Sequence, residues 1–293
     1  MNSSNNRVLL TGATGLIGKE LIAPLKSAGF EIYAITIDET NLTNGVHWIK
    51  GDLFDETFVA RTVADVKPYY LLNMAWATTG DYLASNINYN FLAAGIHLIQ
   101  QFAKNGGKRA VFAGTCFEYA FREAPLKEDE TLDPNKTTYT FCKHQLHEIT
   151  ARFCQSNDIS LGYGRIFYVY GNGESKTRLT GMLIDKLSNN EEITIKSGPL
   201  IKDYIYAKDI ANAFVRLLDS NVQGAVNICT GKGIRIGDYA RAIAKALNKE
   251  PLLKFTDDCA GQPAVIVGDN TRLTTEVGYT IQYDLETALK EIL

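Results

Sequence analysis

The stretch RVLLTGATGLIG, residues 7–18, decides the fold. Its beginning, VLL, is a short apolar run of the kind found in strands that are buried on both faces of a parallel sheet. Gly12, Gly15 and Gly18 follow at intervals of three residues, and residues 19–27 have the pattern of a helix. A strand, a glycine turn and a helix in this order predict a binding site for a dinucleotide.

Each glycine of this turn has its own physical role. The first allows the tight turn off the strand, the second lets the backbone approach a pyrophosphate, and the third lets the helix pack closely on the strand. The helix N-terminus adds unpaired N–H groups and a partial positive charge that attract phosphates. Glycines also serve ordinary turns, but the strand and helix around these three favour binding. The candidate cofactor contacts in the turn are Gly12, Thr14, Gly15, Leu16 and Ile17.

Composition and charge restrict the class of protein. The chain has 293 residues, of which 45% are hydrophobic and 22% are charged, and its net charge is −3, as in an ordinary soluble globular protein. The acidic balance argues against a nucleic-acid partner, and no apolar run approaches the ~18 residues that span a membrane. Five scattered cysteines without a CxxC pair and a polar N-terminus indicate a cytoplasmic protein with reduced thiols and no metal site.

Strand-like and helix-like segments alternate through the first half of the chain. This alternation predicts an α/β fold, a Rossmann-type doubly wound parallel sheet with helices on both faces. We expect a dinucleotide-binding domain over residues 1–170 and a smaller α/β substrate-binding lobe over residues 171–293, with residues 205–230 packing back on the first domain. The expected strands are residues 8–10, 31–37, 48–50, 69–74, 109–113, 160–167, 192–196 and 225–229, and the expected helices are residues 19–27, 88–104, 139–156, 179–187, 208–219 and 236–247.

Three residues are candidates for catalysis. Tyr139 and Lys143, four residues apart on a predicted helix, share one face. A phenol is a poor acid–base group at neutral pH, and we expect the neighbouring ammonium to lower the pKa of Tyr139. Thr115 follows the strand at 109–113, at the sheet edge where open α/β proteins bind ligands. A half-exposed helix face and a threonine that satisfies backbone groups are the structural alternatives, but the dinucleotide turn favours catalysis.

Several motifs occur in a fixed order along the chain. They resemble the extended short-chain dehydrogenase/reductase family, above all its nucleotide-sugar branch, and they cover nearly the whole sequence. The resemblance implies that Thr115, Tyr139 and Lys143 form the catalytic set and that Lys143 also holds the nicotinamide ribose. The motifs are TGATGLIG (11–18), GDL (51–53), GTCFEY (114–119), YTFCK (139–143), RIFYVYG (165–171), KDYIYAKDIANAF (202–214), NICTGKGIRI (227–236) and DNTRL (269–273).

The same resemblance implies further contacts. Asp52 and Leu53 resemble the pair that lines the adenine pocket, and residues 171–178 and 202–206 resemble the contacts with a nucleotide sugar. Basic side chains suit the diphosphate of such a substrate, whereas the alternative for each is an exposed surface cation. The candidates are, for the cofactor, Asp52, Leu53 and Ala75, and, for the nucleotide-diphosphate sugar, Arg178, Lys202 and Tyr204.

Departures from the family pattern narrow the reaction. Members that eliminate water carry an acidic pair directly after the catalytic threonine, where this chain has Cys116 and Phe117, which argues against a 4,6-dehydratase. Members that also epimerise at C3 and C5 use a cysteine at the position of Phe117. Because Cys116 lies one residue away from that position, we interpret it as a packed thiol.

Two reactions remain open. One is reduction of a nucleotide-diphospho-4-keto-6-deoxy sugar at C4, in surface-polysaccharide or deoxy-sugar biosynthesis; the other is C4 epimerisation, in which the hydride leaves and returns. The stretch GNGESKTRL (171–179) and the CFEY variant resemble reductases of deoxy-sugar pathways, which favours the first. A non-catalytic regulatory protein that only binds the dinucleotide is a third alternative, against which the intact catalytic set argues.

The second strand and two helices carry the remaining expectations. An acid at the end of that strand would bind the ribose 2′-OH and repel a 2′-phosphate, but Thr36 occupies this position and favours NADP(H). NAD(H) is the alternative, because Asp38 disfavours a phosphate and no arginine stands at 36–40. The helices at 88–104 and 139–156 resemble those of the family's dimer contact, so we expect a homodimer. On the first of them, Ile96, Ile99 and Phe102 supply either that contact or core.

Overall fold

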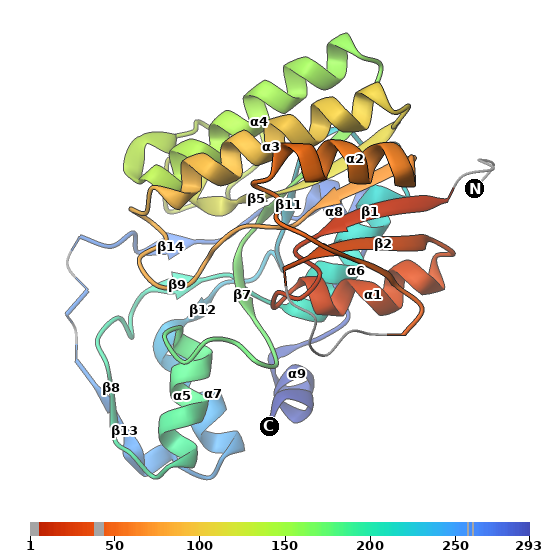
Figure 1. Cartoon of the computed structure of the whole chain (residues 1–293). Helices are drawn as coiled ribbons and strands as arrows, with labels where there is room; N and C mark the ends of the chain where they lie inside the picture. Colours follow the sequence, from red (N-terminus) through yellow and green to blue (C-terminus); the bar gives the residue numbers. More distant parts are fainter. Residues whose placement is uncertain (1–5, 38–43, 257, 260) are drawn as a thin grey trace.

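A seven-stranded parallel sheet forms the centre of the larger lobe in the computed structural model, which describes residues 6–37, 44–256, 258–259 and 261–293 (Figure 1). The strand order is β11-β6-β5-β4-β1-β2-β3, and the order along the chain reverses between β1 and β4. In open α/β sheets the ligand crevice lies at this reversal. The strands are β1 (Arg7–Thr11), β2 (Glu31–Thr36), β3 (His47–Lys50), β4 (Tyr70–Asn73), β5 (Arg109–Thr115), β6 (Ser160–Ile166) and β11 (Gly224–Ile228).

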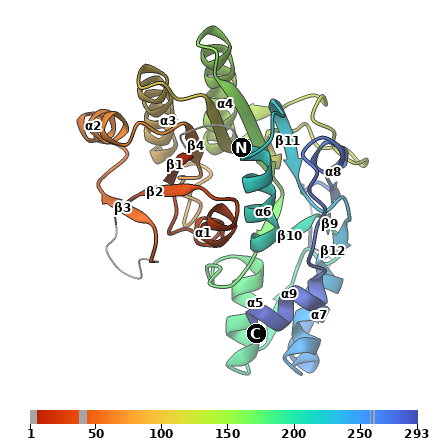
Figure 2. The ribbon, with the colours of Figure 1, turned by 90° about the vertical axis from the view of Figure 1, so that its right-hand side faces the viewer.

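Helices cover both faces of this sheet, as Figure 2 shows. One face carries α1 (Gly18–Ser27) and α6 (Ala207–Leu218), which pack against each other, and the other carries α2 (Glu56–Val66), α3 (Ile87–Lys104) and α4 (Thr138–Ser156). The central strands are buried accordingly: every residue of β5 is buried, because side chains on both of its faces lie under helices. The Rossmann-type fold predicted from the sequence is confirmed.

The smaller lobe lies below the sheet in Figure 1 and has its own apolar core. Its short strands pair in small groups, β10 with β7, β13 with β8, and β9 with β12 and β14. The helices of this lobe are α5 (Leu179–Ser188), α7 (Ile236–Ala246) and α9 (Leu285–Ile292), and α8 (Thr271–Thr275) contacts β11 of the large sheet. The strands are β7 (Tyr168–Tyr170), β8 (Ile193–Ile195), β9 (Ile201–Lys202), β10 (Tyr204–Tyr206), β12 (Ile234–Arg235), β13 (Leu253–Phe255) and β14 (Val265–Ile266).

The six predicted helices are present with ends shifted by no more than about two residues. Helix α2 was not predicted, although Asp55 caps it by accepting a hydrogen bond of 3.0 Å from the Phe58 N–H. On α3, Ile99 and Phe102 are fully buried and belong to the core, which decides between the two roles expected for them. The division of the chain at residue 170 stays a prediction. Among the helices that the structure describes, none is both long and apolar enough to cross a bilayer.

Candidate active site at the carboxyl edge of the sheet

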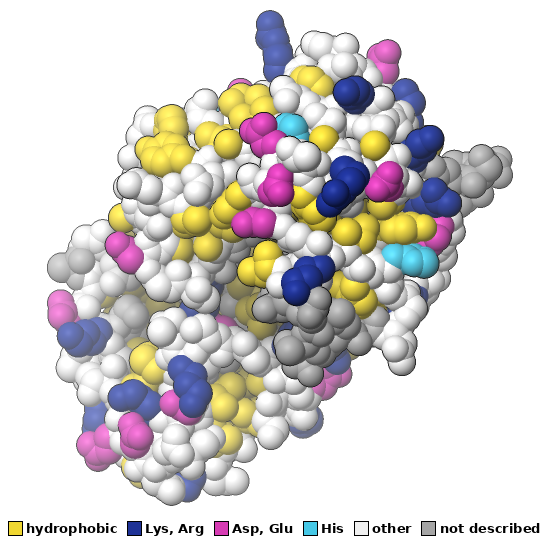
Figure 3. Space-filling model, in the orientation of Figure 1, with side chains coloured by type: hydrophobic (Ala, Val, Ile, Leu, Met, Phe, Trp, Pro, Cys, Tyr) yellow, Lys and Arg dark blue, Asp and Glu magenta, His cyan; other side chains and the backbone are white. Residues whose placement is uncertain are grey.

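A cavity of about 430 Å³ lies where β1, β4, β5 and β6 end. In the space-filling view of Figure 3 the surface is hollowed between the sheet lobe and the smaller lobe. The cavity brings together segments that are far apart in the sequence. Of the predicted site residues, its lining contains Gly12, Gly15, Leu16, Ile17, Thr115, Tyr139, Lys143 and Arg178.

The glycine turn closes one end of this cavity. Gly12 has a φ of +71°, a conformation that residues with a side chain rarely adopt. A Cβ on Gly18 would lie 1.9 Å from the Gly12 carbonyl oxygen, so only glycine lets α1 begin this close to β1. At Gly15 the nearest atom, the same carbonyl oxygen, would be 3.3 Å away, and this backbone faces the cavity. The turn therefore leaves a ligand-sized approach at the N-terminus of α1.

The chain that leaves β4 is tied to the turn. The Thr11 hydroxyl donates to Asn73 Oδ1 over 2.6 Å and accepts from the Ala75 N–H over 3.2 Å. Residues on both sides of Ala75, Met74 and Trp76, line the cavity, whereas Ala75 itself does not. The backbone at Ala75 thus shapes the cavity through its neighbours.

Lys143 projects from α4 to the floor of the cavity. Its ammonium donates to the Ala113 carbonyl oxygen over 2.8 Å, at the end of β5. Burial lowers the pKa of Lys143 to about 7, although the Glu118 carboxylate opposes the shift. Helix α4 holds this side chain because Thr137 caps its N-terminus, with its hydroxyl accepting from the Thr140 N–H.

Tyr139 lies one helical turn before Lys143 and is also buried. Its pKa is raised, not lowered as the sequence predicted, because burial disfavours the phenolate more than its surroundings stabilise it. A side-chain hydrogen bond with Thr115 acts in the opposite direction. The phenol therefore keeps its proton at neutral pH, which suits a proton donor better than a base.

Thr115 ends β5 and caps the 3-10 turn η1 (Cys116–Glu118). Its hydroxyl accepts from the Phe117 N–H over 3.3 Å, and its own N–H donates to Glu118 Oε1 over 3.0 Å. Thr115 thus satisfies backbone groups, which was the structural alternative to a catalytic role, but it lines the cavity as well. Cys116 is buried and packed, as interpreted from the sequence.

A buried polar network is connected to Thr115 through Glu118. The Glu118 carboxylate lies 3.5 Å from Arg165 Nε, and it accepts from the Tyr163 hydroxyl over 3.1 Å. Arg165 in turn donates to the Tyr119 hydroxyl, which donates to Asn227 Oδ1. Burial raises the pKa of Glu118, and the Arg165 charge opposes the shift. The network joins β5, β6 and β11 directly beneath the cavity.

Besides Ala75, four predicted cofactor residues lie outside the lining. Thr14 is exposed at the turn, and Thr36 is buried at the end of β2, where its carbonyl accepts from the Gly51 N–H. Asp52 accepts from the Phe54 N–H over 2.9 Å, and Leu53 packs against the core under α2 and α3. Thr14 follows β1, Thr36 ends β2, and Asp52 and Leu53 follow β3. Asp38 falls outside the described residues.

The three predicted substrate residues are not together. Arg178 lines the cavity and donates to the Thr78 carbonyl oxygen over 2.7 Å. Lys202 is buried, and its ammonium donates to the Pro263 carbonyl oxygen over 2.7 Å. Tyr204 stacks on Tyr239, with ring centroids 4.0 Å apart, and lines a separate hollow. Only Arg178 of the three reaches the cavity.

Four aromatic residues of the cavity lining were not predicted, and one of them, Phe167, directly follows β6. Trp76 and Tyr82 come from the segment after β4, and Phe117 from the turn after β5. Both segments follow strands that end at the ligand-binding edge, which is the one signal that points to them. The rings of Trp76 and Tyr82 each meet the Tyr139 ring edge to face, so aromatic groups enclose the candidate proton donor.

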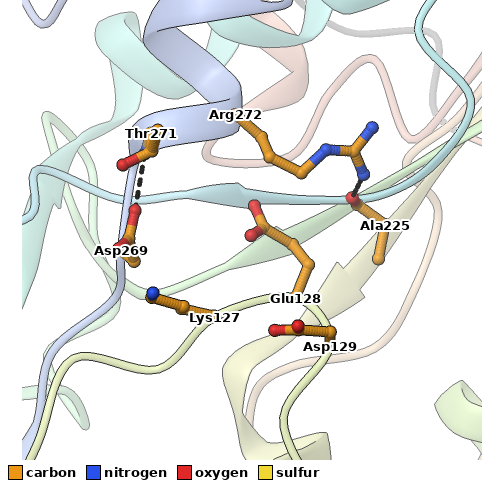
Figure 4. Close-up of a pocket in the computed structure, with 7 residues that line it drawn as sticks. All are labelled: Lys127, Glu128, Asp129, Ala225, Asp269, Thr271 and Arg272. Carbon is orange, nitrogen blue, oxygen red and sulfur yellow. Dashed lines mark hydrogen bonds between the residues drawn. The ribbon is translucent and has the colours of Figure 1, made fainter.

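A second hollow, of about 480 Å³, lies beside β11 and is lined by charged residues (Figure 4). Three of its five charged side chains have hydrogen-bond partners within the protein. Arg272 donates to the Ala225 carbonyl oxygen, Asp269 accepts from the Thr271 N–H, and Glu128 accepts from the Asn227 N–H. In the part of the chain that the structure describes, no three His, Cys, Asp or Glu residues form a group that could hold a metal.

Known proteins that resemble this chain include enzymes that act on nucleotide sugars. Residues 8–229 match the NAD dependent epimerase/dehydratase family. UDP-glucose 4-epimerase from Rhizobium meliloti (strain 1021) is 24% identical, over 96% of this chain and 94% of that protein. The dTDP-4-dehydro-6-deoxyglucose reductase of Escherichia coli is also 24% identical, over 100% of this chain and 98% of the relative. The sequence is thus equally similar to an epimerase and to a reductase.

Solved structures of UDP-glucose 4-epimerases share the fold of this chain. The crystal structure of Thermotoga maritima UDP-glucose 4-epimerase with UDP-glucose superposes with a TM-score of 0.88 at 19% identity. The superposition covers 98% of this chain and 97% of the epimerase. At this identity the likeness establishes the shared fold, including the smaller lobe.

Proposed function

The chain belongs to the NAD dependent epimerase/dehydratase family, and from that premise we propose that it reduces the C4 ketone of a nucleotide-diphospho-4-keto-6-deoxy sugar. The observation that carries the proposal is the common cavity of the glycine turn and the three candidate catalytic side chains, Thr115, Tyr139 and Lys143. The relative that reduces a dTDP-4-dehydro sugar is similar over the whole chain. Surface-polysaccharide or deoxy-sugar biosynthesis is the setting we propose.

The turn between β1 and α1 fits a dinucleotide. The open backbone at Gly15 and the N–H groups at the start of α1 suit a pyrophosphate, because Gly15 and Gly18 have no side chain and both line the cavity. A bound nicotinamide dinucleotide supplies the hydride for the ketone. We favour NADP(H) over NAD(H), since Thr36 and not an acid ends β2.

Each side chain then has a defined task. Thr115 donates a hydrogen bond to the C4 oxygen, and Tyr139 transfers its phenolic proton to that oxygen as negative charge develops on it. Lys143 holds a ribose hydroxyl and stabilises the phenolate that remains on Tyr139. Arg178 pairs with the diphosphate of the sugar nucleotide, because a guanidinium suits phosphate oxygens.

C4 epimerisation is the second candidate, and the similarity to the Rhizobium UDP-glucose 4-epimerase favours it. The same three residues would serve both directions of hydride transfer. The two reactions differ in their net use of coenzyme, so one assay separates them.

The assay mixes the purified protein with a 4-keto-6-deoxy nucleotide sugar and NADPH or NADH and follows absorbance of the reduced nicotinamide. A reductase consumes one coenzyme per sugar, with the higher kcat/KM for NADPH. Interconversion of 4-hydroxy sugars without net loss of coenzyme would instead establish the epimerase. Binding of the dinucleotide without turnover of any sugar would establish the regulatory alternative.

Tyr139→Phe tests the proton donor. We expect kcat to fall by ~10²–10⁴, the usual contribution of general-acid catalysis, with coenzyme affinity retained. Tyr69→Phe, at the opposite edge of the sheet beside β4, is the matched control and should leave kcat unchanged. Turnover of Tyr139→Phe at the wild-type rate would refute the mechanism.

We also propose a homodimer through α3 and α4. These helices pack side by side and leave apolar side chains exposed, namely Tyr89, Phe141 and Ile149. Sedimentation at micromolar concentration should give about twice the mass of one chain, 32.4 kDa. A mass of one chain would contradict the dimer.

A further inference from the structure

The Lys143 ammonium faces an aromatic ring as well as a carbonyl group. Its Nζ lies 3.9 Å from the centroid of the Trp76 ring. The same nitrogen donates the hydrogen bond to the Ala113 carbonyl oxygen. An ammonium has three N–H donors and Lys143 is 4% exposed, so a ring face is a substantial part of its surroundings.

The indole is held in place by buried groups. Its Nε1–H donates to Asn88 Oδ1 over 2.7 Å, and Asn88 is fully buried. The Asn88 amide donates in turn to the carbonyl oxygens of Tyr82 and Ser85. Phe91 stacks against the indole, with ring centroids 5.2 Å apart. Asn88 and Phe91, both on α3, therefore fix the orientation of the Trp76 ring.

The titratable groups near the ammonium come from three elements. Glu118, on η1, is the carboxylate whose charge favours the ammonium, and Tyr139 lies one turn away on the same helix. Tyr163, on β6, donates to the Lys143 carbonyl oxygen and not to its side chain. A tryptophan face attracts a cation most strongly where water is excluded, as it is at this buried position.

We propose that Trp76 is a positioning residue for the reaction, which holds the Lys143 ammonium in its charged form and in one place beside Tyr139. The inference rests on the proposed function, since it assigns Trp76 a role through Lys143. Asn88 completes the arrangement by orienting the indole. The order of effectiveness at position 76 follows from chemistry: tryptophan has the strongest ring face, phenylalanine a weaker one without the N–H anchor, and leucine none.

A spectroscopic test needs no substrate. The sequence contains two tryptophans, so Trp48→Phe leaves Trp76 as the single emitter. Because the ammonium lies on the indole face, we expect the emission of this variant to change in one step as Lys143 loses its proton. Lys143→Met in the same background should abolish that step. Emission that is independent of pH, or a step that survives Lys143→Met, would overturn the proposal.

The second test uses turnover. The alkaline limb of the pH profile of kcat/KM should move to lower pH by about one unit in Trp76→Leu, and by less in Trp76→Phe, because the charged form of Lys143 loses its aromatic partner. Trp48→Phe, on β3 and outside the cavity, is the control and should keep the wild-type profile. If Trp76→Leu and Trp76→Phe both lose activity while the alkaline limb of kcat/KM stays at its wild-type pH, the role of Trp76 is merely structural and the proposal is overturned.

The two tests also separate this inference from the proposed function. A Lys143-dependent emission step in a protein that turns over no sugar supports the contact and refutes only the enzymatic role. An active reductase without the step overturns the role of Trp76 alone. If Trp76→Leu fails to fold, Trp76→Phe and the emission test decide the question.

Discussion

The two ends of the cavity are built in different ways. At the glycine end, the wall consists of Gly12 and residues 15–18, which belong to one short stretch with three glycines. At the other end the wall consists of side chains from segments that are far apart in the sequence. Arg178, for example, donates a hydrogen bond to the carbonyl oxygen of Thr78, which lies 100 residues earlier in the chain. Backbone geometry depends on local spacing, whereas convergence of side chains depends on the whole fold. Local spacing in the sequence therefore predicts the first end, whereas it does not predict which segments meet at the second end, such as those of Arg178 and Thr78.

A substitution at Gly18 tests the construction of the glycine end most directly, and we expect it to have the largest effect of all on stability. Gly18→Ala would bring a Cβ to 1.9 Å from the Gly12 carbonyl oxygen, so β1 and α1 must separate. We expect the free energy of unfolding to fall by about 3 kcal/mol or more. Urea denaturation of the coenzyme-free protein measures this loss.

Gly15→Ala is the matched control in the same turn. Its Cβ would meet the nearest atom at 3.3 Å, so we expect stability to change by less than about 1 kcal/mol. Because this backbone faces the cavity, coenzyme affinity should still fall by about tenfold. Equal loss of stability in both variants would show that the glycine end is not built as we describe.

The second comparison sets Arg178 against Lys202, two cations that the sequence places equally near a substrate. Arg178→Ala should raise the Kd for the sugar nucleotide by roughly 10- to 100-fold, because it removes a charge-assisted hydrogen bond from the cavity wall. Lys202→Met should change that Kd by less than about twofold and should lower stability by about 1–3 kcal/mol, since it leaves the Pro263 carbonyl oxygen without its donor. Isothermal titration calorimetry measures the two Kd values, and urea denaturation measures the loss of stability. A large effect of Lys202→Met on Kd would extend the substrate site beyond the cavity.

The sequence predicts the sheet, its helices and the glycine turn because each depends on local patterns. Apolar runs predict the buried strands, and helical spacing places Tyr139 and Lys143 on one face. The short strands of the smaller lobe have two or three residues each, too few for a periodic pattern. Helix α2 was missed although its cap, Asp55, carries an ordinary helix-start signal.

The environment of each site residue was harder to predict than its position. Tyr139 is where the motif predicts, but its pKa moves upward because burial depends on Trp76 and Tyr82, which come from another segment. Lys202 follows the motif as well, yet its side chain turns to Pro263, 61 residues later. Sequence spacing carries no information on such distant partners.

The smallest expected effect concerns Glu174, in the loop before α5 at the side-chain end of the cavity. Burial raises the pKa of Glu174 to about 7, while Thr180 and Arg178 oppose the shift. Its Oε2 is buried without a hydrogen-bond partner among the described residues. The folded state therefore binds this proton more tightly than the unfolded chain, whose carboxyl titrates near its ordinary value of 4.5. Between these two values the free energy of unfolding must fall as pH rises, and above both it stays at the lower level.

Glu174→Gln removes this dependence, so the stability of the wild type relative to the variant should fall by about 1 kcal/mol between about pH 5 and pH 7. Urea denaturation at pH 5, 6, 7 and 8 measures the difference, with the exposed Glu123→Gln as the matched control. Parallel curves for wild type and Glu174→Gln would show that the loop opens to water and leaves the carboxylate solvated. The side-chain end would then differ from the glycine end in mobility as well as in construction, because a backbone wall cannot open without unfolding β1 and α1.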